Sequence, residues 1–501
     1  MSRILLLIVF LTWMSYGSSL YPQGDPVTMA RPAEFMAGFA VLILLTAILC
    51  RRLAQRVEGG NLNDTLKRFN KLMTVARVAV PIWFFVGVSF MGWGALVNGH
   101  LAALELHPDR FDTPGLLVGS LPALLGWMGL WWAQYPAEIA FREQGMLAQI
   151  DAGLPVHRPP TLGSYLRANL RLQVLFTAVP VVVLISLRDV LALAVAPFGL
   201  SDENSAVVQL SLSLVTAAVV MLFAPELLKR LLETEPMPDG PLRQRLQEIC
   251  QRHGIGCRDI LLWRTDHNMG NAAVMGLVPR IRYVLMSDLL LETMTDEQIE
   301  AVFAHELGHI IHRHMLWFAV FFGTMMFALV GLSGPLQRLA DHWTSQSTWP
   351  SALGTAAASV LCITIFLFLS RRFERQADVF AARTLQEESA LLTVGASSEA
   401  AQSSPMNTGE SGERSHVGLH GATVFSSALH QVARINCIPI TAWSWCHGSI
   451  AKRMDYLQEL SQHPGKTAEF DRFMSRLYAV LILSLCAFGV WAMIALSQQH
   501  G

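Results

Sequence analysis

The chain has 501 residues, with 37 Lys and Arg against 38 Asp and Glu, so its formal net charge is −1. Charged residues make up 15% of it and apolar residues 52%, whereas an ordinary soluble domain carries roughly 25% charged residues. This composition excludes a soluble multidomain enzyme, a disordered protein and a protein that binds nucleic acid through a basic surface. It indicates a polytopic membrane protein that is mainly α-helical.

The N-terminal segment 1–21 allows two interpretations. The apolar run Ile4–Met14 follows Arg3 and has the length of a signal-peptide core. The same run can extend to Tyr21 as a first membrane helix. Both interpretations stay open at this point.

Eight later apolar runs are long enough to cross the hydrocarbon core of a bilayer. They lie at about 35–50, 75–97, 115–135, 172–187, 205–224, 315–335, 350–370 and 472–496. The sequence therefore predicts membrane helices within 35–228, a membrane hairpin at 315–370 and a last membrane helix at 472–496.

One charged pair, Arg188-Asp189, interrupts the apolar stretch 172–200. A helix that ends at the membrane interface explains the pair, and this is the favoured interpretation. The alternative is a charge pair that lines a water-filled cavity between helices.

Basic residues alternate between successive loops, and this alternation predicts the orientation of the chain. The segments 51–74 and 136–171 carry six and four Lys or Arg residues. The loops between them carry one Arg and no Lys each, at 18–34, 98–114, 188–204 and 336–349. We therefore expect 229–302 and 371–470 to lie on the cytoplasmic side.

Residues 229–302 have the pattern of a small α/β unit. Pro241–Arg252 has helical periodicity, and Asp259–Arg264 and Ile281–Met286 are typical of strands, with Asn271–Met275 as a short strand between them. After these strands, a Thr-x-x-Gln capping box at residue 295 opens a further helix. Much later, Ser and Gly clusters at 386–425 predict a flexible insertion.

The capped helix leads into His305-Glu306-Leu307-Gly308-His309, an HExxH motif. Residues four apart share a helical face, so both imidazoles can bind one metal ion. Glu306 is rotated by about 100° from His305 and can reach a metal-bound water without being a ligand. The spacing of the seven cysteines supports neither a disulfide framework nor a zinc ribbon. A metal ion must therefore be held by histidine and carboxylate.

The candidate third ligand is Glu374. Because 315–335 and 350–370 are antiparallel spans, His309 and Glu374 leave the membrane at a similar depth, each about 6–9 Å beyond its span. Asp378 follows Glu374 by one helical turn and is placed to fix a ligand histidine through its free ring nitrogen. A merely solvated face of acidic and basic residues is the less favoured alternative.

Two more histidines, His312 and His314, extend the cluster. The spacing allows only His305 and His309 to pair with Glu306 in the HExxH pattern. We therefore expect His312 and His314 to lie behind the ligands or at the membrane interface.

These motifs resemble those of the integral-membrane zinc metalloproteases of the CAAX prenyl endopeptidase and HtpX type. The resemblance covers about 229–465 and includes the order HELGH, His314 and then Glu374-x-x-x-Asp378. It implies a peptidase domain at 229–465 with one zinc ion per chain, bound by His305, His309 and Glu374.

The resemblance also implies roles for residues outside these motifs. Asn271 and Ala272 correspond to a segment that lies along the substrate, and Arg453 to a residue that supports the ligands. His447 would stabilise the oxyanion, although Gly448 replaces the proline that the family has after this histidine.

The predicted function is hydrolysis of peptide bonds in membrane-associated or unfolded polypeptides, with Glu306 as general base. An alternative within the class is processing of lipidated C-terminal peptides. A non-catalytic zinc-binding scaffold or a transporter is the alternative from another class. Glu306 argues against a scaffold because such a protein needs no acid that is not a ligand.

Overall fold

The computed structural model describes most of the chain: residues 6, 8–10, 12–13, 30–57, 62–106, 111–151, 158–195, 197, 202–343, 349–398, 416–436 and 438–497. Most of the segment 1–21, with its two interpretations, lies outside these residues. The chain divides into two units, Met1–Glu235 with Trp263–Asn268, and Pro236–Leu262 with Met269–Gly501. The fold is mainly α, with one small sheet.

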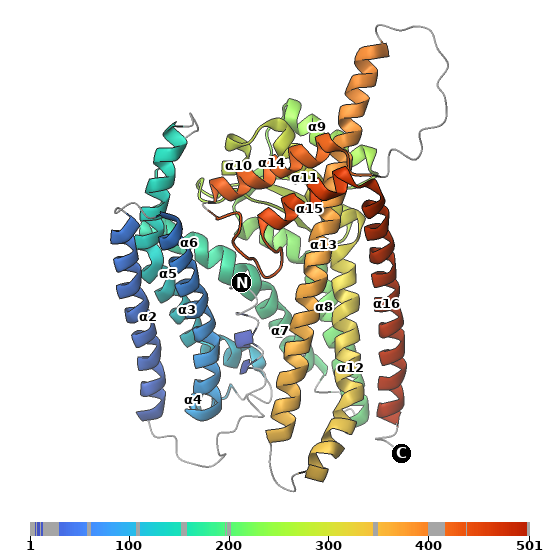
Figure 1. The fold of residues 1–501 in the computed structure, drawn as a ribbon. Helices are drawn as coiled ribbons and strands as arrows, with labels where there is room; N and C mark the ends of the chain where they lie inside the picture. Colours follow the sequence, from blue (N-terminus) through green and yellow to red (C-terminus); the bar gives the residue numbers. More distant parts are fainter. Residues whose placement is uncertain are drawn as a thin grey trace. The chain divides into compact units, whose positions relative to one another are not determined.

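The first unit is built from apolar helices. α2, α3 and α5 run side by side (Figure 1), and large side chains such as Phe35, Phe84, Trp127 and Trp131 are fully buried. The helices are α2 (Ala30–Val57), α3 (Leu62–Phe90), α4 (Trp93–Ala103), α5 (Asp112–Asp151), α6 (Leu162–Asn169), the π-helix Leu170–Leu175, α7 (Phe176–Val195) and α8 (Asp202–Leu231).

The expected helix end at Arg188-Asp189 is wrong, because α7 continues to Val195. Arg188 forms an ion pair with Asp112. Asp189 is buried and accepts hydrogen bonds from the backbone N–H of Thr113 at 2.9 Å and from its hydroxyl at 2.8 Å. Both charges are therefore satisfied by the first turn of α5, which allows them to lie inside a continuous helix.

Among the described residues, six helices are long and apolar enough to cross a membrane, and a seventh is reached if a bent helix pair is one span. The six are Arg31–Val57, Asp64–Phe90, Asp112–Met146, Leu162–Val195, Ser211–Leu231 and Pro464–Ile494. The predicted runs 315–335 and 350–370 lie inside the helices α12 (His314–Trp343) and α13 (Trp349–Ser398). The chain is thus a multi-pass helical membrane protein.

A four-stranded sheet carries the strand order β1-β2-β4-β3. β3 and β4 pair antiparallel, with Ala272 opposite Met286 and Met275 opposite Tyr283, so β3 is an edge strand. The strands are β1 (Thr234–Pro236), β2 (Asp259–Trp263), β3 (Ala272–Met275) and β4 (Tyr283–Ser287), preceded by helix α9 (Pro241–Arg252) and followed by the short helix α10 (Asp288–Thr293). The predicted helix and three predicted strands are confirmed, whereas β1 was not predicted.

The helix with the HExxH motif is α11 (Asp296–Ile311). Its capping box is formed as predicted, with reciprocal bonds between Thr295 and Gln298. α11 ends at Ile311, before the apolar run 315–335 that follows it in the sequence. Arg313 adopts a left-handed conformation with φ of 53°, and α12 starts at His314 after a bend of 44°.

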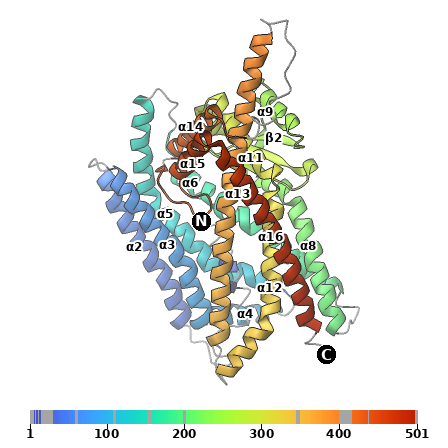
Figure 2. The ribbon, with the colours of Figure 1, turned by 45° about the vertical axis from the view of Figure 1, so that its right-hand side comes forward.

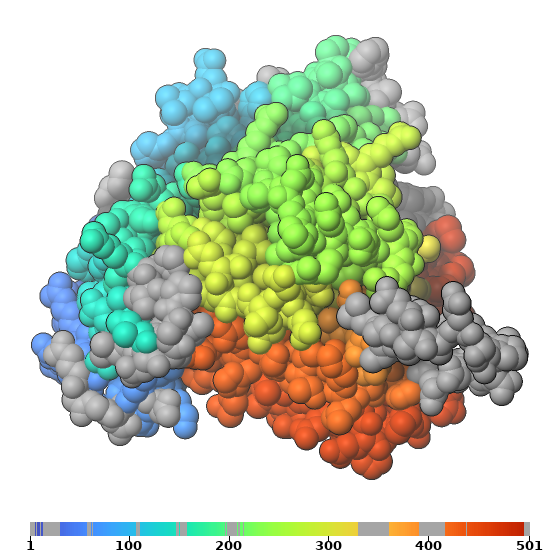
Figure 3. Space-filling model, turned by 90° about the horizontal axis from the view of Figure 1, so that it is seen from above, coloured from blue at the N-terminus to red at the C-terminus, as the bar shows by residue number. Residues whose placement is uncertain are grey.

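The remaining helices of the second unit complete its core. α12, α13 and α16 (Pro464–Ser497) run alongside one another in both ribbon views (Figures 1 and 2). α14 (Leu419–Ile435) and α15 (Ile450–Gln462) pack against each other. Seen from above, the orange surface of α13–α15 lies beside the green-to-yellow surface of α9–α11 (Figure 3).

The predicted flexible insertion at 386–425 is too long at both ends. α13 extends to Ser398, and α14 begins at Leu419 with Ala422, Phe425 and Leu429 buried on one face. Two glycines in this stretch, Gly418 and Gly421, concealed the helical spacing. Residues 399–415 lie outside the described part of the chain.

Candidate active site

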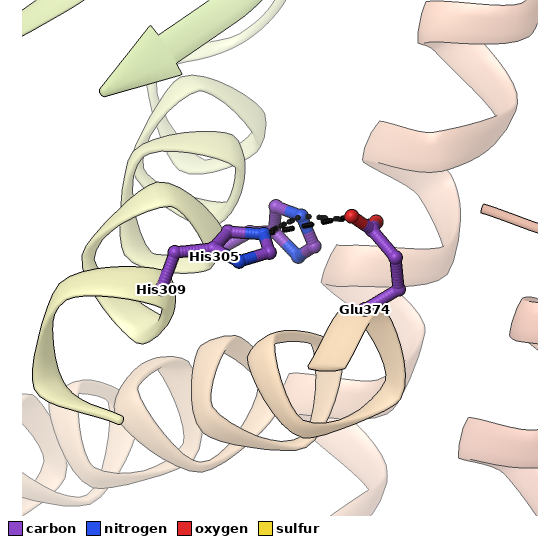
Figure 4. Close-up of side chains that lie close together, drawn as sticks. All are labelled: His305, His309 and Glu374. Atoms are coloured by element: carbon purple, nitrogen blue, oxygen red, sulfur yellow. Dashed lines mark hydrogen bonds and ion pairs between the residues drawn. The ribbon is translucent and has the colours of Figure 1, made fainter. Parts of the chain in front are cut away.

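Three side chains from two helices converge in the second unit (Figure 4). The Nε2 atoms of His305 and His309 on α11 are 3.3 Å apart. They lie 3.6 and 3.7 Å from the carboxylate oxygens of Glu374 on α13. Ligand atoms of all three residues fall within 4.8 Å of one another, which is the only such cluster among the described residues.

A glycine allows α11 and α13 to approach closely enough for this cluster. A Cβ atom at Gly308 would lie 2.9 Å from the Cα of Ala377, closer than side-chain carbons come to backbone in real proteins. Gly308 is the fourth residue of the HELGH sequence. The motif therefore supplies the space for the facing helix as well as two of the converging side chains.

His305 is held by a buried pair of charges. Its Nδ1 lies 2.9 Å from Asp378 Oδ1, and Arg453 donates to both oxygens of that carboxylate at 2.8 and 2.6 Å. Burial favours the neutral acid, but the Arg453 guanidinium outweighs it and holds the pKa of Asp378 below its usual value. Phe425 stacks on the imidazole with ring centroids 5.7 Å apart.

Glu306 belongs to the motif but not to the cluster. Its carboxyl group accepts a hydrogen bond from the backbone of Val274 on β3, and burial raises its pKa. The carbonyl of Asn271 already accepts from the N–H of Ser287 on the neighbouring strand. Since strand residues alternate in direction, Ala272 and Val274 turn their backbone N–H groups away from β4, toward the free edge of the sheet.

The predicted substrate segment therefore lies close to the motif helix, because β3 packs on α11. The structure places the backbone of Asn271 against β4, where its N–H donates to Ser287 Oγ at 2.8 Å. Ala272 is buried at the start of β3. The next outward N–H group, that of Val274, reaches Glu306.

His447 reaches the cluster from the loop between α14 and α15. Its Nδ1 lies 2.9 Å from Glu374 Oε1, while its side chain is 57% exposed. Burial favours a neutral Glu374, but its interactions with His447, His305 and Arg453 outweigh burial and hold the pKa of Glu374 well below its usual value. The loop is fastened to α13 where Ser370 donates to the carbonyl of Cys446 at 3.2 Å.

The other ligand candidate, His309, has a partner that the sequence did not indicate. Its Nδ1 lies 2.8 Å from Nδ1 of the buried His314, whose Nε2 lies 3.0 Å from Oε1 of Gln376. Gln376 stands between Glu374 and Asp378 in the sequence, but its side chain lies on a different face of α13. No sequence pattern pointed to Gln376 or to Val274, because both contacts depend on how separate elements pack.

The donor set fits a zinc ion. Two imidazoles and one carboxylate, each with a polar group on the side away from the cluster, are a ligand set of zinc in hydrolytic sites that keep an open position for water. Burial lowers the pKa of His309 to about 4, which favours the neutral form that binds a metal.

Comparison with protein families matches residues 236–461 to peptidase family M48. The chain contains an M48 peptidase domain. This result confirms the resemblance to membrane proteases of the CAAX prenyl endopeptidase and HtpX type.

Curated relatives of the M48 domain come from plants, bacteria and archaea. A CAAX prenyl protease 1 homologue of Arabidopsis thaliana is 26% identical over 183 residues, 34% of this chain and 43% of the relative. A protease HtpX homologue of Bordetella pertussis is 24% identical over 163 residues, 30% of this chain and 55% of the relative. The chain thus spans about half the length of these relatives.

The fold of the whole chain is similar to the crystal structure of S. mikatae Ste24p. The TM-score is 0.51 at 16% sequence identity, and the superposition covers 86% of this chain and 100% of the other. At this identity the likeness concerns the fold alone.

Proposed function

We propose that the protein is a membrane-embedded zinc endopeptidase with one zinc ion per chain and Glu306 as general base. The position of Glu306 carries this proposal. It lies between His305 and His309 in the sequence, is absent from the metal-ligand cluster and faces an edge strand. A site that only stored or structurally used a metal ion would have no need for this additional acid.

Zinc held by His305, His309 and Glu374 would lower the pKa of a bound water to about 7 and polarise the substrate carbonyl. Glu306 would accept the proton of that water and pass it to the leaving amine. Its raised pKa suits a group that must both take up and release a proton. The exposed ring of His447 would donate to the developing oxyanion.

The edge of β3 would hold the substrate. An extended peptide can add to an exposed strand through main-chain hydrogen bonds, a mode that selects conformation more than sequence. The backbone groups of Ala272 and Val274 that point away from β4 face this edge, where the N–H of Val274 contacts Glu306. This arrangement supports cleavage of membrane-associated or unfolded polypeptides.

We place the active site on the cytoplasmic side of the membrane. The support is the alternation of Lys and Arg between loops, with six in 51–74 and four in 136–171 against a single Arg in the loops between.

A second substrate class is a lipidated C-terminal peptide. The similarity to a protein named as a CAAX prenyl protease 1 homologue supports it. Purified protein in detergent should be offered matched peptides with and without a prenylated cysteine. Cleavage of the prenylated peptide alone would favour processing, and equal cleavage would favour the broader endopeptidase.

The direct test of the proposal is comparative proteomics of membranes that contain the parent protein or the Glu306→Gln variant. We expect polypeptides that accumulate only with the variant, and casein cleavage only by the parent protein. A protein that binds zinc but shows no difference from Glu306→Gln in either assay would instead be a zinc-binding scaffold or transporter.

A further inference from the structure

The two ligand imidazoles are supported by different chemistry. His305 Nδ1 faces Asp378, an ionised carboxylate. His309 Nδ1 faces another imidazole, that of His314, at 2.8 Å. His309 contacts His314, which has no negative charge to offer. The contacts from His309 through His314 to Gln376, here called the path, determine where the ring protons lie.

His309 directs Nε2 into the ligand cluster, so its proton resides on Nδ1. His314 must then accept that proton's hydrogen bond through its own Nδ1, which places the His314 proton on Nε2. That nitrogen lies 3.0 Å from the amide oxygen of Gln376, which can only accept. The hydroxyl of Tyr478 donates to the same oxygen. The ring protons of His309 and His314 therefore both point outward from the metal ligand, and the amide oxygen of Gln376 accepts from His314 on one side and from Tyr478 on the other.

The bend between α11 and α12 makes this path possible. In a straight helix, residues five apart point about 140° away from each other, so His309 and His314 could not meet. The left-handed Arg313 turns the chain and brings His314 back against the ligand. The His314 ring is 1% exposed and lies parallel to Phe373, with centroids 4.5 Å apart, so its orientation is fixed by packing.

We propose that His314 is a positioning residue for His309, and that Gln376 and Tyr478 act through it by fixing its tautomer. The inference rests on the proposed zinc site. Tyr478 belongs to α16 and stacks on Trp317 with centroids 4.2 Å apart. The path therefore connects a zinc ligand to α12, α13 and the last membrane helix.

The test measures zinc binding to the full chain in detergent by competition with a chelator, together with the absorption spectrum of the Co²⁺-substituted protein. His314→Phe keeps a ring but removes the acceptor, so zinc affinity should fall about 10–100-fold. His314→Asn places an amide oxygen where Nδ1 stood and should retain most of the affinity and the parent Co²⁺ spectrum.

His312→Gln is the matched control. His312 is also an imidazole at the bend, but it stacks on His314 and meets Phe380 edge to face without touching a ligand. We expect parent-like zinc affinity for this variant. Gln376 tests the same path from its far end. Gln376→Met should lower zinc affinity, because the His314 proton loses its acceptor and can then move to Nδ1. Gln376→Glu keeps an acceptor oxygen and should retain zinc affinity.

Two results would overturn the proposal for His314. The first is His314→Phe binding zinc as tightly as His312→Gln. The second is His314→Asn losing as much affinity as His314→Phe, since only packing would then matter. A parent protein that binds no zinc would instead refute the proposed function itself, so the two failures are distinguishable.

Discussion

Asp378 serves two partners at once, a ligand histidine and a guanidinium. Its side chain is 1% exposed and that of Arg453 is 12% exposed, so the pair lies in a medium that penalises any unpaired charge. The planar guanidinium group of Arg453 donates two short N–H···O bonds to the two oxygens of the Asp378 carboxylate, a two-pronged contact. Arg453 therefore keeps the Asp378 carboxylate ionised, and this carboxylate in turn contacts His305.

We predict that Arg453→Met destabilises the protein by about 3–5 kcal/mol, the usual cost of leaving one buried charge without its partner. Arg453→Lys should rescue little, because an ammonium group cannot form the two-pronged contact. Thermal unfolding in detergent, with zinc content measured in parallel, checks both variants. Unchanged stability of Arg453→Met would show that Asp378 does not depend on this partner.

At the scale of elements, the site depends on the contact between α11 and α13. Gly308 faces the backbone of Ala377, and Gly421 on α14 is similarly close to the carbonyl of Ala382. These glycines stand inside helices, where glycine is less favourable than alanine by roughly 1 kcal/mol. The close approach of the neighbouring helix backbone therefore explains why glycine occupies positions 308 and 421.

Gly308→Ala should lower zinc affinity even though it favours helix formation, because the added methyl group moves His305 and His309 away from Glu374. Gly489→Ala on α16 is the matched control, since the nearest atom to its new Cβ would be 3.9 Å away. Circular dichroism should show intact helices in both variants, and chelator competition should separate them. Equal zinc affinity would mean that α11 and α13 can separate without cost to the site.

The sequence predicted the elements that follow from local signals. The capping box at Thr295, the helix Pro241–Arg252 and the apolar runs depend on residues close in the chain, so their patterns were visible. The spacing also predicted that His305, His309 and Glu374 would meet. The bend at Arg313 was not visible, because a left-handed arginine is stabilised by its surroundings. The contact of His314 with His309 depends on that bend.

At the scale of the whole molecule, the chain combines an M48 domain over residues 236–461 with helices that cross a membrane. Within the second unit, α12 carries His314 and α13 carries Glu374 and Asp378 of the site. The site therefore lies at the ends of the predicted membrane spans 315–335 and 350–370, which belong to these two helices.

The membrane orientation gives a prediction at this scale. A reporter fused near Gly395 should be cytoplasmic, and one near Ser345 should lie on the opposite side, because the preceding loops alternate in Lys and Arg content. Paired enzymatic reporters that are active on only one side of the membrane provide the measurement. Both fusions on the same side would contradict the hairpin.

The central claim is that Glu306 acts on water whereas Glu374 binds the metal ion, and measuring zinc content and activity in two variants tests it most directly. Glu306→Gln is nearly isosteric, so it should keep one zinc ion per chain and lose about 10²–10⁴-fold in peptidase rate. Glu374→Ala removes an anionic ligand, so zinc content should fall together with activity, and excess zinc should restore only this variant in part. Full zinc content and near-normal activity in Glu374→Ala, or loss of zinc in Glu306→Gln, would contradict the assignment.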